Sequence, residues 1–235
     1  MKSIAIITGV SRGIGAASAT AFRDRGWTVL GLSRTSCPVD GVDHLSVDLL
    51  AEGWVDSVSK RLATLLSESP SQICLIHNAA MMVKDTAVSV DPSELRSAFE
   101  LNVVVPTMLN ALVRPYMGPT SSILYIGSTL ATKAVANTAS YVMTKHAIAG
   151  LMKATCQDLG GTGIHTACIC PGFTATEMLL SHIGEDAETR TFIESLSTFG
   201  RLINPNEIAE TLFFCAENPV INGALLHANL GQVER

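Results

Sequence analysis

A serine, a tyrosine and a lysine in this chain have the types and the order needed to transfer a proton. Tyr141 and Lys145 are four residues apart, and Ser128 precedes them. Because positions i and i+4 share one face of a helix, the phenol and the ammonium would point into the same space. A phenol is a poor base at neutral pH, and a nearby ammonium stabilises its anion. The spacing therefore predicts a tyrosine that donates or accepts a proton while Ser128 orients the substrate oxygen.

A glycine-rich turn near the start of the chain favours this hypothesis over an ordinary surface helix. Residues 3–8 are apolar and predict a buried parallel strand. Gly9, Gly13 and Gly15 follow, and residues 16–24 predict a helix. Such a turn lets the backbone approach a pyrophosphate, and the helix N-terminus offers it free N–H groups. The order predicts a dinucleotide site, although a glycine-rich turn without a ligand can have the same pattern.

The end of the next predicted strand indicates which dinucleotide binds. An acidic residue after the strand at 27–33 would bind the ribose 2′-hydroxyl and repel a 2′-phosphate. Ser33 and Arg34 stand there instead, and Arg12 lies in the glycine turn. Two guanidinium groups can bind a phosphate through charge-assisted hydrogen bonds. The sequence predicts NADPH/NADP+ rather than NADH; the alternative is that Arg34 is a solvated loop residue.

These motifs together resemble those of the short-chain dehydrogenase/reductase family, in its single-domain form, over residues 2–231. Residues 8–15 are similar to the family's Thr-Gly-x-x-x-Gly-x-Gly turn, and Ser128, Tyr141 and Lys145 to its catalytic residues. Four further segments carry the resemblance: Asp48-Leu49, which would contact adenine; His77-Asn78-Ala79-Ala80, similar to Asn-Asn-Ala-Gly; Asn102, whose backbone would bind a proton-relay water; and residues 171–176, which would hold the nicotinamide carboxamide.

The motifs and the resemblance imply two sets of site residues. The catalytic set is Asn102, Ser128, Tyr141 and Lys145. The cofactor-binding set is Gly9, Ser11, Arg12, Gly13, Ile14, Gly15, Ser33, Arg34, Asp48, Leu49, Asn78, Ala79, Tyr141, Lys145, Pro171, Gly172, Thr174 and Thr176.

The chain departs from the family pattern at two places. Ala80 replaces a glycine and would narrow the space beside the ribose or change the backbone angle. His77 is expected to be either a buried, hydrogen-bonded residue or a weak point in the packing, and not catalytic. Asn229-Leu230-Gly231 stands where the family usually has Gly-Gly near the last strand. The far wall of the substrate pocket can therefore differ from that of the family.

The implied activity is hydride transfer from NADPH to the carbonyl of a small apolar or aromatic ketone or aldehyde, reversible as alcohol oxidation. A dehydrogenase working mainly in the oxidative direction would use the same residues. A non-catalytic dinucleotide-sensing regulatory protein is the alternative from another class, since a fold alone does not establish activity. A β-ketoacyl reductase would need a basic patch for its carrier protein, which Arg96, Arg114 and Lys133 do not obviously form.

A segment at about 175–201 is expected to be irregular and, by resemblance, to form a lid over the substrate. It contains Met178 and Phe192 among other apolar residues, and Met81, Met82 and Phe173 would face it. Methionine adapts to the shape of an apolar ligand. The alternative is that these side chains only pack the lid onto the core.

Composition limits the other possibilities. A chain of 235 residues fits one α/β domain over 1–235, and a net charge of −5 argues against a nucleic-acid partner. Without a leader or a long apolar run we expect a cytoplasmic protein with no membrane partner. Charged residues make up only 16%, so subunit contacts of a homo-oligomer, a dimer or tetramer, could cover apolar surface. The six cysteines fit reduced thiols, and Cys168 and Cys170 lack further ligands for a metal site.

Strand and helix patterns alternate along the chain and predict a Rossmann-like, doubly wound parallel sheet of about seven strands with helices on both faces. Pro106 and Pro115 are expected to kink or end their helix. Asn204 is expected to cap the last helix, with proline in its first turn. The predicted strands are 3–8, 27–33, 44–47, 73–77, 122–127, 163–169 and 223–228, and the helices 13–25, 54–67, 93–115, 138–159 and 205–217.

Overall fold

A seven-stranded parallel sheet forms the centre of the computed structural model, which describes residues 2–67, 70–184 and 186–233. The strands lie in the order β3-β2-β1-β4-β5-β6-β7, and all neighbours are parallel. This confirms the predicted doubly wound fold. The strands are β1 (Ser3–Thr8), β2 (Thr28–Ser33), β3 (Asp43–Ser46), β4 (Gln72–His77), β5 (Ser122–Ile126), β6 (His165–Pro171) and β7 (Ala224–Ala228).

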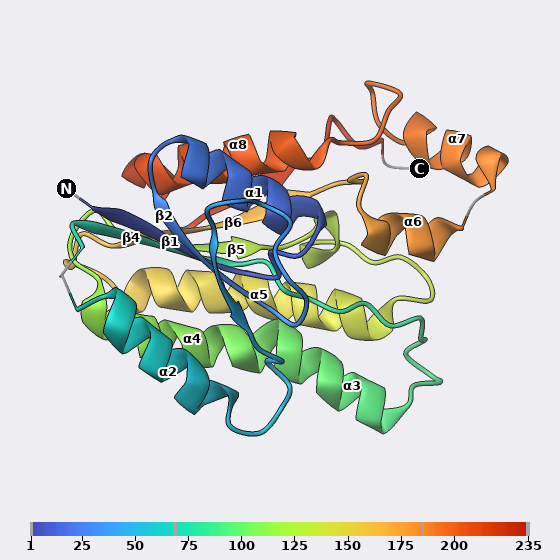
Figure 1. Ribbon diagram of the computed structural model, residues 1–235. Coiled ribbons are helices and arrows are strands. Elements are labelled where there is room, and N and C mark those ends of the chain that lie inside the picture. The colour runs from blue at the N-terminus through green and yellow to red at the C-terminus, as the bar shows by residue number, and fades with distance from the viewer. Residues whose placement is uncertain (1, 68–69, 185, 234–235) are drawn as a thin grey trace.

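Helices cover both faces of the sheet. Helices α1 (Gly13–Asp24) and α8 (Pro205–Glu217) lie on one face, and α2 (Trp54–Leu65), α4 (Val105–Val113) and α5 (Ala139–Asp158) on the other, as Figure 1 shows. The central strands are therefore apolar on both sides: Ile4 and Ile6 join one core cluster, and Ala5 and Ile7 the other. The chain runs outward from β1 to β3 and returns to β4 on the opposite side of β1. A ligand crevice is expected at such a reversal.

The predicted helix over 93–115 is interrupted in the structure. Helix α3 (Pro92–Phe99) leads into a π-helical turn, Glu100–Val104, then α4, then a 3-10 turn, Arg114–Tyr116. Pro106 has no N–H to donate to a carbonyl four or five residues back, so the regular α-helical ladder cannot pass through this point. The Val105 amide donates to the Glu100 carbonyl in the π pattern instead. The α-helix is therefore interrupted just before Pro106, at the turn that contains Asn102.

The segment expected to be irregular contains two helices. Helix α6 (Glu177–Ile183) begins at Thr176, whose side chain accepts a hydrogen bond from the Leu179 amide. Helix α7 (Ala187–Ser195) begins at Asp186, which accepts one from the Thr189 amide. Residue 185, within the expected lid, lies outside the described residues. The polar cap residues are the signal that the sequence carries for these two helices.

Gly15 is expected to be intolerant of a side chain, because a Cβ there would lie 2.0 Å from the carbonyl oxygen of Gly9. Gly15→Ala should lower the free energy of unfolding by about 1–3 kcal/mol. Gly150→Ala is the matched control in the exposed part of α5, where a Cβ meets nothing within 4 Å; it should stabilise by up to about 1 kcal/mol. Urea unfolding of the two variants tests this, and equal stabilities would contradict the close approach.

Candidate active site

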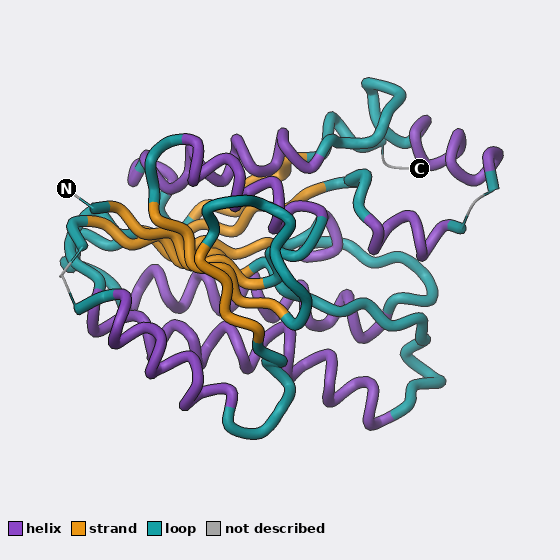
Figure 2. The backbone as a smooth tube through the Cα atoms, viewed as in Figure 1, coloured by secondary structure: helices purple, strands orange, loops and turns teal. Residues whose placement is uncertain are grey.

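Many of the predicted site residues follow the carboxyl ends of the strands, where parallel strands place their loops at one edge of the sheet, whereas Asn102, Tyr141 and Lys145 lie in helical segments. Figure 2 shows these loops in teal beyond the strands. Gly9 to Arg12 follow β1, Arg34 follows β2, Asp48 and Leu49 follow β3, Asn78 and Ala79 follow β4, Ser128 follows β5, and Gly172, Thr174 and Thr176 follow β6. The topology therefore gathers segments far apart in the sequence, and this edge is where open α/β sheets bind ligands.

Hydrogen bonds from the end of β4 hold the glycine turn in place. The Asn78 side-chain amide donates to the carbonyls of Thr8 and Gly9 at 2.8 and 3.0 Å. The Thr8 hydroxyl accepts from the amides of Asn78 and Ala79 at 3.0 and 2.9 Å. Gly9 adopts a φ of 73°, which favours glycine. The two neighbouring loops thus form one rigid unit at the reversal between β1 and β4.

The N-terminus of α1 is left available to an anion. Arg12 stands at the cap position in an extended conformation, no side chain caps the helix, and its first turn contains no acidic residue. The first N–H groups of a helix need acceptors from outside it. Helix α8, by contrast, has a capping box made by Asn204 and Glu207. The uncapped end of α1 therefore fits the phosphate groups of a dinucleotide.

Two exposed arginines flank this end of the sheet. Within the described part of the chain, neither Arg12 nor Arg34 has a carboxylate partner. The Ser46 hydroxyl donates to the Arg34 carbonyl at 3.1 Å and so helps to hold that loop. The Ser33 hydroxyl donates to the Thr35 carbonyl at 2.8 Å and lies 3.0 Å from His44 Nε2. Ser33 thus presents no negative charge here, and its hydrogen is already used within the loop.

Helix α5 places Tyr141 beside a buried cation. Lys145 is only 3% exposed, and its Nζ lies 5.3 Å from the centroid of the Tyr141 ring. The ammonium donates to the Ile126 carbonyl at the end of β5, at 2.7 Å, and it has no carboxylate partner among the described residues. Burying a charge without a counter-ion costs free energy, and groups buried in this way are candidates for functional sites.

Ser128 follows β5, and among the described residues its hydroxyl hydrogen has no acceptor. Its Oγ accepts a hydrogen bond from the Leu130 amide at 3.1 Å, at the start of the 3-10 turn Thr129–Ala131. A hydroxyl that accepts one bond can still donate another. Ser128 can therefore offer a hydrogen bond to a substrate oxygen.

Asn102 is buried, and its side chain is engaged in hydrogen bonds. Its Oδ1 accepts from the Met81 amide at 2.8 Å, and its Nδ2 donates to the Met81 carbonyl and to the Thr144 hydroxyl at 2.9 and 3.0 Å. The Thr144 hydroxyl in turn donates to the Tyr141 carbonyl at 2.9 Å. With the side chain engaged in this way, any role in proton transfer falls to the Asn102 main chain.

The sequence analysis overlooked two buried polar residues of α5 beside the predicted catalytic pair. Ser140 and Thr144 are buried and, like Tyr141 and Lys145, are four residues apart. Each stands one position before a predicted catalytic residue. A polar i, i+4 pair beside Tyr-x-x-x-Lys was the available signal, because such a pair shares a helix face that needs polar partners.

His77 and the cysteine pair behave as structural features. His77 is buried, with Nε2 2.8 Å from Asn110 Oδ1, and burial lowers its pKa to about 4, so its ring is neutral. Nε2 thus fits the buried, hydrogen-bonded alternative, while Nδ1 is buried without a hydrogen-bond partner among the described residues. Cys168 and Cys170 place their Sγ atoms 3.9 Å apart, and their hydrogen bond raises the pKa of Cys168 and lowers that of Cys170. Across the described ranges, no group of three or more histidine, cysteine or acidic residues could hold a metal ion.

Comparison with known proteins places the chain in a family. The family model described as Enoyl-(Acyl carrier protein) reductase matches residues 9–232. The chain belongs to the short-chain dehydrogenase/reductase family. It is an oxidoreductase of that family, acting on a carbonyl or a CH–OH group, with a nicotinamide cofactor. No helix in the described ranges is long and apolar enough to cross a bilayer.

Similar proteins span several activities. The 3-oxoacyl-[acyl-carrier-protein] reductase FabG of Vibrio harveyi is 29% identical, over 97% of this chain and 96% of its own length. Carbonyl reductase family member 4 of Danio rerio is 27% identical, over 96% of each chain. The ligand-free aldohexose dehydrogenase of Thermoplasma acidophilum superposes with a TM-score of 0.88 at 25% identity, over 98% of this chain and 93% of that one. These names leave the substrate open.

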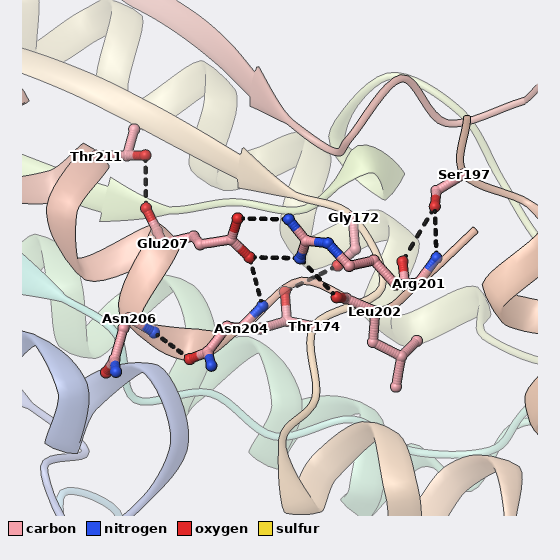
Figure 3. A network of polar contacts seen from close by, with 9 residues as sticks. All are labelled: Gly172, Thr174, Ser197, Arg201, Leu202, Asn204, Asn206, Glu207 and Thr211. Carbon is pink, nitrogen blue, oxygen red and sulfur yellow. Dashed lines mark hydrogen bonds and ion pairs between the residues drawn. The ribbon is translucent and has the colours of Figure 1, made fainter. Parts of the chain in front are cut away.

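A polar cluster joins the far end of the 175–201 segment to α8. Figure 3 shows Arg201 making two hydrogen bonds to the Glu207 carboxylate, at 2.7 and 2.8 Å. The same carboxylate accepts from the Asn204 amide at 2.8 Å. Nearby, the Ile203 amide donates to the Phe173 carbonyl at 2.8 Å, so the two ends of the segment meet.

Glu207 is expected to stabilise the protein in a pH-dependent way. Its hydrogen bonds to Arg201 and then to the Asn204 amide lower its pKa from 4.5 to about 2. A lowered folded-state pKa contributes stability that is complete above about 4.5 and is lost as the pH falls toward 2. Glu207→Gln should therefore be less stable than the native chain at about pH 7 and equally stable near pH 2. The effect should be small because both side chains are partly exposed.

Urea unfolding across this pH range makes the measurement, with Glu210→Gln as control. Glu210 lies on the same helix and contacts Arg25, but it takes no part in the capping box. A difference for Glu207→Gln that stays constant with pH would show that the carboxylate is not the stabilising group.

Proposed function

We propose that the protein is an NADPH-dependent reductase of small, apolar or aromatic ketones or aldehydes. The observation that carries the proposal is the buried Lys145 ammonium beside Tyr141, at the carboxyl edge of the sheet. When bound, the reduced nicotinamide supplies a hydride to the carbonyl carbon. Tyr141 donates its proton to the developing alkoxide, Lys145 stabilises the resulting phenolate, and Ser128 holds the oxygen by a hydrogen bond. Oxidation of the alcohol is the reverse of these steps.

The residues around the glycine turn fit the cofactor. The uncapped first turn of α1 would accept the pyrophosphate, and Asp48 and Leu49 would contact the adenine. The exposed guanidinium groups of Arg12 and Arg34 would bind a 2′-phosphate. The segment from Pro171 to Thr176 would contact the nicotinamide; there an added Cβ at Gly172 would lie 2.9 Å from Asn229, so glycine is needed for close packing.

Proton supply to Tyr141 would pass through the π-helical turn. Pro106 removes the N–H that would otherwise engage a carbonyl of this turn, which leaves main-chain acceptors near Asn102. A water bonded there could connect Lys145 to solvent. Interruptions of this kind often occur at functional sites.

The proposed substrate class rests on the side chains near the proposed lid, residues 175–201. The lid and the rest of the chain would form a single domain over 1–235. Met81, Met82 and Phe173 are half-buried at the carboxyl edge, and the lid carries the exposed Met178 and Phe192. Apolar side chains that are not fully packed can close on an apolar ligand.

Two further properties belong to the same proposal. Exposed Met108 on α4 and Met143 on α5 support a homo-oligomer, which light scattering at assay concentration would test. A cytoplasmic location fits the reduced cysteines.

The name of the Vibrio harveyi relative favours a second candidate substrate, a 3-oxoacyl group on a carrier protein.

Tyr141→Phe should reduce turnover by on the order of a hundredfold or more while NADPH affinity stays within about twofold, because only the proton donor is lost. NADPH consumption is measured against ketones, diketones, quinones, aldehydes and a 3-oxoacyl thioester. Tyr116→Phe, at an exposed tyrosine outside the site, is the control. Unchanged turnover in Tyr141→Phe would refute the acid assignment, and tight NADPH binding without turnover by the native chain would favour a dinucleotide sensor.

Arg34→Asp should raise the KM for NADPH by about tenfold or more and lower that for NADH, because the carboxylate repels the 2′-phosphate and binds a 2′-hydroxyl. Arg96→Asp makes the same charge change on α3 and should leave the ratio unaltered. If the two variants have equal NADPH/NADH preference, Arg34 is not the phosphate contact.

A further inference from the structure

We propose that Asp85 is the residue that positions Tyr141, by capping the catalytic helix α5 from a different part of the chain. Asp85 lies in the loop after β4 and is 7% exposed. Its carboxylate accepts from the Ser140 amide at 3.0 Å through Oδ1 and at 3.3 Å through Oδ2, and also from the Ser140 hydroxyl. The role of Tyr141 itself rests on the proposed function.

The main chain of Asp85 strengthens the same junction. Its carbonyl accepts from the Ala139 amide at 3.4 Å, and its amide donates to the Asn137 carbonyl at 3.3 Å. Asp85 therefore supplies acceptors to the first two amides of α5. The residue at the cap position, Thr138, does not cap the helix with its side chain; its hydroxyl donates to the Val135 carbonyl at 2.7 Å. An N-terminal turn left without acceptors would fray.

A second attachment lies one turn further along α5. Asn102 joins the Met81 main chain to the Thr144 hydroxyl. The loop over 81–85 is thus tied to Ser140 by Asp85 and to Thr144 through Asn102. Two contacts spaced by four residues fix the rotation of a helix about its axis, since each residue advances by about 100°. Tyr141 and Lys145 follow these two residues by one position each, so the same contacts set their direction.

The two attachments should affect different steps. Tyr141 is the third residue of α5 and lies in the turn that Asp85 caps. Lys145 lies beyond Thr144 and remains held by the Ile126 carbonyl. Loss of Asp85 should misplace the proton donor and leave most cofactor contacts intact. The expected signature is a lower kcat with little change in the KM for NADPH.

Asp85→Ala should lower kcat by on the order of ten- to a hundredfold, because small misplacements of a reacting group reduce rates by such factors. Asp85→Asn retains one acceptor oxygen and should lie between this variant and the native chain. Asp91→Ala is the matched control: Asp91 caps α3 by accepting from the Ser93 amide and hydroxyl at 2.7 and 2.5 Å. It should reduce stability without changing kcat.

A double-mutant cycle with Ser140→Ala separates positioning from general destabilisation. If the two residues act through one contact, Asp85→Ala should lower kcat by a smaller factor in the Ser140→Ala background than in the native chain. Hydrogen exchange at the Ala139 to Tyr141 amides, which needs no substrate, should be faster in Asp85→Ala and unchanged in Asp91→Ala.

Two results would overturn the proposal: a native kcat in a folded Asp85→Ala, or equal losses of kcat in Asp85→Ala and Asp91→Ala. Absence of turnover by the native chain would count against the proposed function instead. In that case, unchanged amide exchange in Asp85→Ala would still overturn the capping of α5 by Asp85.

Discussion

The parallel direction of all the strands is the constraint on which the rest of this structure depends. The glycine turn, Arg34, Asp48, Asn78, Ser128 and the segment after β6 each follow a strand, and parallel strands end at the same edge, so these segments meet there. Parallel strands also need helical crossovers, which bury both faces of the sheet and make its centre apolar. At the reversal between β1 and β4, the glycine turn and the end of β4 are joined by Asn78 and Thr8.

Polar groups at this edge are held by main-chain partners. Lys145 donates to a strand carbonyl, Asn102 brackets the main chain of Met81, and Asp85 accepts from the first amides of α5. Buried polar groups need such partners, and main-chain partners move little. The same contacts therefore satisfy buried groups and restrict the directions of Tyr141 and Lys145. The positions of Tyr141 and Lys145 therefore depend on how the loops pack around α5.

Sequence patterns predicted helices and strands well where the apolar period was strong. They predicted them less well where contacts with other segments of the chain change the local hydrogen bonding. The cap at Asn204 and the strands were confirmed within a few residues. The helix over 93–115 was expected to continue through Asn102, but Pro106 and the contacts with Met81 favour a π-helical turn. The segment over 175–201 lacked a clear apolar period, yet local caps at Thr176 and Asp186 begin two short helices.

The sequence by itself determined the strand–turn–helix order, the glycines of the first turn and the i, i+4 spacing of Tyr141 and Lys145. These depend on local sterics and helix geometry, which neighbouring residues specify. The tertiary structure alone decided that Asp85 caps α5 and that the Lys145 charge is buried without a carboxylate partner among the described residues. Such contacts join segments some fifty residues apart, and no local pattern specifies which distant loop supplies an acceptor to a helix end.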